Sequence, residues 1–150
     1  MPSEITLYSR GGDWKAEVEA WKNSFLVYKS IGTEVTVYHR EQTKNVWGNT
    51  VTDWVRKAAN SISITNVYRG TGPGLATRSQ VCNNSSYCEL KHWAVGVTIN
   101  LPADGITDLG GGAILDIDSV TGSVAISIPG GELLSGEVSA SSAISDSSIW

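Results

Sequence analysis

Three short stretches of this 150-residue chain place an arginine one or two residues after a tyrosine. A tyrosine has an apolar ring with a polar hydroxyl, and an arginine adds a permanent positive charge with several N–H donors. On one exposed face, such residues can stack on a sugar or bind an anionic group. We therefore predict a ligand-binding stripe, with outward residues that only cap a sheet as the alternative. The pairs are Tyr8 with Arg10, Tyr38 with Arg40, and Tyr68 with Arg69.

The other aromatic residues divide into predicted core and predicted surface. The chain has six Trp and five Tyr but one Phe, a balance that favours side chains with polar tips. Tyr87, next to a cysteine, and Trp93, at the start of an expected strand, are predicted to be exposed ligand-binding residues. The spacing of four tryptophans predicts that they pack into the core. These four are Trp14, Trp21, Trp47 and Trp54.

Residues for enzymatic chemistry are few. Only two histidines occur, His39 and His92, and no G-x-S-x-G motif marks a nucleophile. Gly11-Gly12 lacks the remainder of a phosphate-binding motif, and no clustered Cys or His residues predict a metal site. We therefore expect a non-enzymatic protein without a metal or cofactor. An enzyme is the alternative, and His39 is then the first residue to mutate.

Cys82 and Cys88 enclose five residues and are predicted to form a small disulfide loop, with reduced thiols as the alternative. The enclosed Asn83 and Asn84 each begin an N-x-S glycosylation pattern. Both features favour an extracellular or surface-exposed location, although the first residues show no signal peptide.

The charge of the chain argues against some partners. The net charge is −4, and its 11 basic residues are scattered rather than clustered, so we expect no nucleic-acid partner. No run of about 18 apolar residues predicts a transmembrane helix. A glycan, a membrane surface or a second copy of the chain remains as a partner.

Repeated patterns in the first 70 residues predict the elements that carry these residues. Residues 4–10 and 34–40 alternate as strands do, and residues 61–70 predict a third strand. Between them, apolar residues at i, i+4 and i+7 predict one helix starting at Trp14 and a second starting at Trp47. The predicted order is therefore β-α-β-α-β.

The second half predicts a loop, strands and a tail. Residues 71–88 are expected to form a long loop, and residues 92–102 a strand. Residues 112–131 are expected to form a hairpin with its turn at 119–122, followed by a short strand at 132–138. The Ser-rich segment 138–150 predicts a C-terminal tail that contacts a neighbouring subunit.

Two short segments resemble strands of actinoporin-like pore-forming proteins. They are "NVYRG" (66–70) and "GAILDID" (112–118), and they span 12 residues of generic strand sequence. The resemblance implies a β-sandwich flanked by two helices that recognises membranes through aromatic clusters.

Taken together, these patterns predict an α+β fold: a mainly antiparallel sheet or sandwich flanked by two short helices, in one domain (1–137) with a tail (138–150). An α/β fold with a parallel unit at 4–69 is the alternative. The expected function is a non-enzymatic surface-binding protein, lectin-like or similar to a membrane-binding toxin. The alternative is a self-assembling fibre, coat or tail subunit, a homo-oligomer held by the C-terminal tail.

Overall fold

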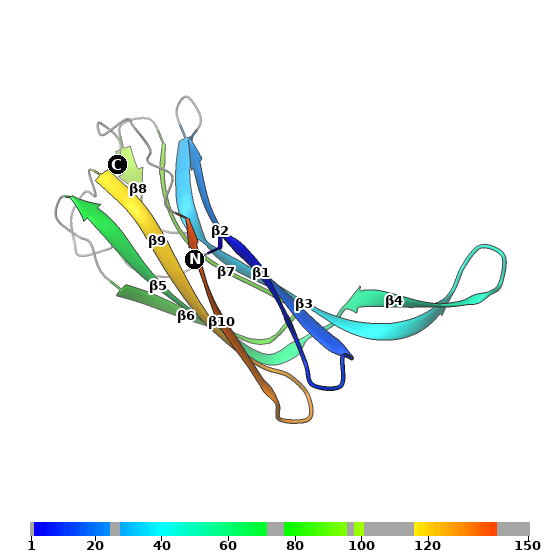
Figure 1. Ribbon diagram of the computed structural model, residues 1–150. Helices are drawn as coiled ribbons and strands as arrows, with labels where there is room; N and C mark the ends of the chain where they lie inside the picture. Colours follow the sequence, from blue (N-terminus) through cyan, green and yellow to red (C-terminus); the bar gives the residue numbers. More distant parts are fainter. Residues whose placement is uncertain (1, 25–27, 72–76, 96–97, 101–115, 141–150) are drawn as a thin grey trace.

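The computed structural model describes residues 2–24, 28–71, 77–95, 98–100 and 116–140, which form two antiparallel β-sheets packed face to face (Figure 1). The first sheet has the order β1-β2-β3-β7-β8, with β4 paired to the free part of β3. The second has the order β10-β9-β5-β6. The strands of the first sheet are β1 (Glu4–Tyr8), β2 (Trp14–Ser24), β3 (Tyr28–Lys44), β4 (Thr50–Arg56), β7 (Tyr87–Val95) and β8 (Thr98–Asn100). Those of the second are β5 (Ala59–Thr71), β6 (Thr77–Ser85), β9 (Asp116–Ser127) and β10 (Leu133–Ala140).

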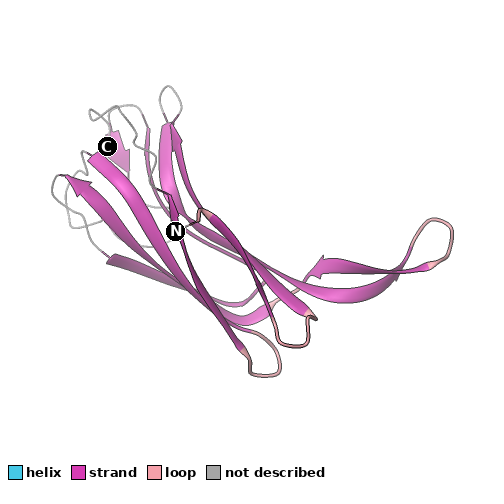
Figure 2. Ribbon diagram, viewed as in Figure 1, coloured by secondary structure: helices cyan, strands magenta, loops and turns pink. Residues whose placement is uncertain are grey.

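The expected helices are absent from the described residues, so the predicted α+β class is wrong and the fold is all-β (Figure 2). The parallel alternative is wrong as well, because every strand pair in the described ranges is antiparallel. Within these ranges the structure contains no helix long and apolar enough to cross a membrane.

The first expected helix is strand β2, and its burial pattern explains the error. Trp14 and Val18 lie on one face in both a helix and a strand, because four residues span one helical turn or two strand repeats. The intervening Ala16 is also buried, whereas Lys15 and Glu17 point away from the interior. This period of two defines a strand with one face in the core.

The second expected helix is one half of a β-hairpin. Strand β4 pairs with β3 from Tyr38↔Arg56 to Lys44↔Thr50, and the turn between them contains Trp47. Thr50, Val51 and Thr52 favour a strand because β-branched side chains are restricted in a helix. Trp47, expected in the core, is 82% exposed at this turn.

Strands also replace part of the expected loop and shift the expected turn. Residues 77–85 and 87–95 form β6 and β7, whereas residues 72–76 lie outside the described part. Residues 119–122 belong to the continuous strand β9, and the chain turns instead at Gly130 and Gly131, which have φ of 101° and 94°. The strands expected within 4–10, 34–40, 61–70 and 132–138 are confirmed.

The core lies between the two sheets and consists largely of β-branched and aliphatic side chains. Ile31 and Val35 of β3 face the second sheet, and Ile62, Ile64 and Ile126 face the first; all five are fully buried. Alternation along each strand places these apolar residues inside and polar residues outside. Hydrophobic burial of this continuous layer is the main stabilising contribution to the sandwich.

A polar network crosses this apolar interior. The Thr33 hydroxyl donates to Asn66 Oδ1 at 2.7 Å, and Asn66 Nδ2 donates to the Tyr68 hydroxyl at 3.1 Å and to the Leu90 carbonyl at 3.0 Å. Both Thr33 and Asn66 are fully buried. Gly122 lies against Thr33, where a Cβ atom would overlap the threonine side chain. The network therefore fixes the relative position of the two sheets, and Gly122 makes room for it.

Strand β3 is longer than its neighbours and forms an arm with β4. Its pairing with β2 ends at His39 and that with β7 at Thr36. Beyond these positions β3 pairs only with β4, and the two strands extend away from the sandwich (Figure 1). We call residues 38–57 the arm.

Candidate functional site

The structure brings Tyr8 and Tyr38 together but places Tyr68 elsewhere. Tyr8 is opposite Lys15 in the strand register, and Lys15 is opposite Tyr38, so all three lie in one row on the outer face of the first sheet. Tyr68 is only 4% exposed and belongs to the polar network in the core. A stripe of all three tyrosines is therefore not formed.

The arginines of the three pairs lie in different places. Arg40 is exposed on the outer face of the first sheet, opposite Trp54 in β4. Arg10 is in the turn after β1, where its backbone N–H donates to the Glu132 carboxylate at 3.1 Å. Arg69 is exposed on β5 of the second sheet, at a register shift. Trp93 is on β7 opposite Ser30, and its side chain is outside the described part.

Four aromatic and three basic side chains from five strands meet on the outer face of the first sheet. We call this set the cation–aromatic band. Within it, the Lys15 ammonium lies 5.2 Å from the ring centroid of Tyr38 and 4.8 Å from that of Trp54. The band consists of Tyr8, Lys15, Tyr38, Arg40, Trp54, Arg56 and Tyr87.

Further contacts extend the band in both directions. The Arg40 guanidinium lies 5.9 Å from the Trp54 ring centroid, and that of Arg56 lies 5.7 Å from the Tyr87 ring centroid. The rings of Tyr8 and Trp54 are 6.3 Å apart and tilted by 56°. Each cation–π contact at an exposed site contributes about 0.5–1 kcal/mol. The rings and cations are thus held in place before any ligand arrives.

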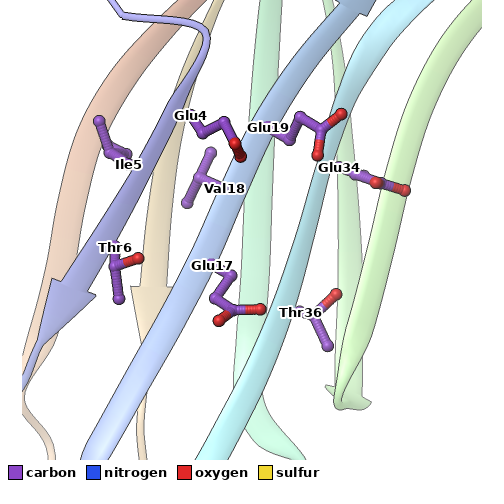
Figure 3. A pocket seen from close by; sticks show the side chains of 8 residues that line it. All are labelled: Glu4, Ile5, Thr6, Glu17, Val18, Glu19, Glu34 and Thr36. Carbon is purple, nitrogen blue, oxygen red and sulfur yellow. The ribbon is translucent and has the colours of Figure 1, made fainter.

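An acidic row crosses the same face next to the band. Glu4, Glu19, Glu34 and Glu89 are successive partners in the register of β1, β2, β3 and β7. Three of them line a shallow hollow of about 210 Å³ together with Glu17 (Figure 3). No group of His, Cys, Asp or Glu side chains in the described residues has the arrangement of a metal site.

The acidic row has electrostatic consequences for its own members. Burial, with the neighbouring charges of Glu34 and Glu4, raises the pKa of Glu19 above its ordinary value. The Tyr87 hydroxyl lies 2.6 Å from Glu34 Oε2 and 2.8 Å from Glu89 Oε2, and its single hydrogen is shared between the two carboxylates. Burial, together with these two carboxylates, raises the pKa of Tyr87, so its hydroxyl stays protonated. Tyr87 therefore links the acidic row to the band.

The outer face of the first sheet is consequently polarised. The acidic row repels anions, whereas Arg40 and Arg56 extend the band onto the arm as a positive, aromatic surface. Such a surface can hold an extended ligand by stacking on its apolar faces and by charge-assisted hydrogen bonds to its anionic groups.

His39, the first candidate for catalysis, has partners in the structure at the base of the arm. Its ring lies 4.6 Å from the Trp14 ring, and its Nδ1 lies 3.2 Å from Glu41 Oε2. The same carboxylate oxygen accepts from Lys57 Nζ at 3.1 Å. The hydrogen bonds from Lys57 and His39 lower the pKa of Glu41. These contacts join β2, β3 and the end of β4. The side chain of His92 lies outside the described part.

The predicted disulfide between Cys82 and Cys88 is confirmed. It joins β6 of the second sheet to β7 of the first across the turn between them, with Cα atoms 5.8 Å apart. The disulfide is weakly compatible with an extracellular location.

The sequence patterns miss three members of the band. They place Trp54 in the core and assign no binding role to Lys15 or Arg56. Strict alternation after Trp14 would have placed Lys15 on the outer face, beside Tyr8 and Tyr38. Trp54 required knowledge of the register between β3 and β4, which the sequence alone does not reveal.

No family model, curated protein or solved structure matches this chain. The two helices implied by the resemblance to actinoporin-like proteins are not found in the described residues.

Proposed function

We propose that this protein is a non-enzymatic binding protein and that its cation–aromatic band recognises an acidic glycan. The observation that carries this proposal is the convergence of four aromatic rings and three cations, from five strands, on one outward face. Sugar rings present apolar C–H faces that stack on aromatic side chains, and their carboxylate or sulfate groups pair with Lys and Arg.

The shape of the surface favours an extended ligand. The band runs across strands instead of lining a deep cleft, and its most exposed ring, Tyr8, is 59% exposed. Arg56 is opposite Tyr38 in the strand register and Arg40 is opposite Trp54, so the two arginines lie at neighbouring positions where the band continues onto the arm. An anionic polymer can contact several of these groups at once, while the glutamates on the other side exclude it from the rest of the face.

Binding to immobilised heparin, with neutral glycans for comparison, tests the proposal. We expect wild-type protein to bind the acidic polymer and to bind more weakly at high salt. Changing Tyr8→Ser and Arg56→Gln together should weaken binding at least about tenfold, equivalent to 1.4 kcal/mol. Val81→Ser on β6 is the matched control, because Val81 is 57% exposed on the second sheet, away from the band.

Two results would contradict the proposal. One is a wild-type protein that binds neither acidic nor neutral glycans. The other is a Tyr8→Ser/Arg56→Gln variant that binds as tightly as the Val81→Ser control. Vesicles of anionic lipid, assayed in parallel, show whether the same face binds a membrane instead.

The second candidate function is a self-assembling structural subunit. The expected contact through the tail falls mainly on residues 141–150, which lie outside the described residues, and β10 continues to Ala140. The observation that favours this function is the arm, in which β4 and the part of β3 beyond His39 pair only with each other among the described strands and extend away from the sandwich.

A further inference from the structure

The tip of the arm presents two apolar side chains to solvent. Val46 is 92% exposed and Trp47 is 82% exposed. Tryptophan is the residue type that most often dominates the binding energy of a protein interface when it becomes buried. An exposed tryptophan at the end of a projecting hairpin is therefore a suitable anchor for a partner.

The turn holds the backbone that carries these side chains in a fixed conformation. Asn45 Oδ1 accepts hydrogen bonds from the backbone N–H groups of Trp47 at 2.9 Å and Asn49 at 3.0 Å. The Asn45 N–H donates to the Asn49 carbonyl, and the Gly48 N–H donates to the Asn45 carbonyl, both at 3.0 Å. Gly48 has a φ of 80°, which glycine adopts without strain. The tip is thus preorganised, and little conformational entropy is lost when it binds.

The β3–β4 hairpin that carries the tip has few neighbouring strands. Beyond His39 and Thr36, β3 has no neighbour other than β4 among the described strands. A two-stranded hairpin is marginally stable alone, and its unpaired edges favour association with another chain.

Charge identifies the partner. The arm contains four basic residues and two acidic ones, whereas the rest of the chain, which we call the body, contains seven basic and thirteen acidic residues. The arm of one copy and the body of another are therefore attracted to each other, and two arms repel. The body is also the partner certain to be present at the same concentration as the arm.

We propose that the arm docks onto the body of a second copy of this chain, with Val46 and Trp47 as the apolar anchors of the contact. The interaction is arm-on-body, and its specificity comes from the opposite charges of the two surfaces. This proposal goes beyond glycan binding: its apolar anchors at the tip lie outside the cation–aromatic band, whereas Arg40 and Arg56, two of the four basic residues of the arm, belong to both surfaces.

Sedimentation velocity over a protein concentration of about 1 μM to about 1 mM, the range of weak specific association, tests the proposal. We expect the full chain to self-associate with concentration and to dissociate as salt is raised. The Val46→Ser/Trp47→Ser variant should associate at least about tenfold more weakly. The Val81→Ser control, which also removes an exposed apolar residue, should associate as the wild type does. Circular dichroism verifies that the variants are folded.

A mixing experiment distinguishes arm-on-body from arm-on-arm contact. A fluorescently labelled tip variant keeps an intact body, so it should still be recruited into wild-type complexes. Exclusion of the labelled variant from those complexes would overturn the arm-on-body contact.

Three further results would overturn the proposal. They are a wild-type protein that stays monomeric throughout, a tip variant that associates as strongly as the wild type, and an equal loss of association in the Val81→Ser control. Binding to vesicles of phosphatidylserine and phosphatidylcholine is measured as the last comparison. A monomeric wild type that binds them through Val46 and Trp47 would assign the tip to a membrane. If the Val46→Ser/Trp47→Ser variant no longer self-associates but still binds heparin, the docking of the arm and the binding of a glycan are distinct activities.

Discussion

The two halves of β3 show how one strand serves two different surroundings. In its first half, Ile31, Thr33, Val35 and Val37 are fully buried beneath the second sheet, and β2 and β7 flank the strand. In its second half, residues 40–44 are exposed or partly exposed and pair only with β4. The backbone is the same extended chain throughout.

The sandwich and the arm are therefore stabilised by different interactions. Hydrophobic burial and the polar network around Asn66 stabilise the first half of β3. The turn at Asn45 and the cross-strand contacts of Trp54 stabilise its second half. Substitutions in the sandwich should therefore affect global unfolding, and substitutions in the arm should act locally.

The largest effect is expected from Ile31→Ala in the buried half of β3. Ile31 is 0% exposed, and truncating a buried isoleucine lowers the free energy of unfolding by about 2–5 kcal/mol. Thr43→Ala in the arm half of the same strand is the control and should change it by less than about 1 kcal/mol. Urea denaturation measures both. Similar losses for the two variants would show that the halves are not distinct.

The next largest effect is expected from Asn66→Ala, which removes the centre of the polar network. Thr33 and the Leu90 carbonyl would lose their hydrogen bonds to Asn66 in the interior, lowering the free energy of unfolding by about 2 kcal/mol. A double-mutant cycle with Thr33→Val measures the coupling between the two side chains. Additive losses would mean that the network does not act as a unit.

A smaller, local effect is expected from Asn45→Ala at the tip of the arm. The variant loses two hydrogen bonds from the turn, which contribute about 1 kcal/mol each at most. Native-state hydrogen exchange should accelerate at residues 41–53 and remain unchanged at Ile31 and Val35. Faster exchange at those core amides would show that the arm and the sandwich unfold together.

The smallest effect is expected from Glu19→Gln on the acidic row. The raised pKa of Glu19 means that its ionised form is less favourable in the folded protein than in the unfolded chain. Stability should therefore fall as the pH rises through 4.5, the ordinary pKa, and the raised folded-state value. At neutral pH the variant should be more stable than the wild type by a few tenths of a kcal/mol, as expected for opposed like charges.

The pH dependence provides the check on this prediction. The difference between Glu19→Gln and the wild type should disappear as the pH is lowered below 4.5, because Glu19 is then protonated in both states. Thermal melting at several pH values measures it. Glu137→Gln is the control, since Glu137 faces Ser123 in the register instead of another glutamate. Equal effects of the two substitutions would exclude the acidic row as the cause.

The sequence predicted much of the strand content but not the class of the fold. The strands within 4–10, 34–40, 61–70 and 132–138, and the disulfide, follow from alternation and from cysteine spacing. The first expected helix is wrong because Trp14 and Val18 satisfy both periods. The deciding residues, Ala16 and Ala20, are small and carry little hydrophobic signal, although both are buried in β2.

Other errors came from contacts between residues distant in the sequence. The sequence predicts Gly122 in a turn, but it lies inside β9, where Thr33 of the other sheet leaves no room for a side chain. The sequence also predicts Tyr68 on the surface, but it is buried beside Asn66, which is held by Thr33 and the Leu90 carbonyl of the other sheet. Thr33 is far from both Asn66 and Gly122 in the sequence, so no local pattern reveals these contacts.

The length of β3 has a mechanical consequence. A pull on the tip of the arm is transmitted along one uninterrupted strand into the middle of the first sheet. There the hydrogen bonds to β2 and β7 lie across the direction of the load. They must therefore yield together in shear instead of opening one after another like a zipper. The arm is thus the outer end of a strand whose other half is buried and held between β2 and β7.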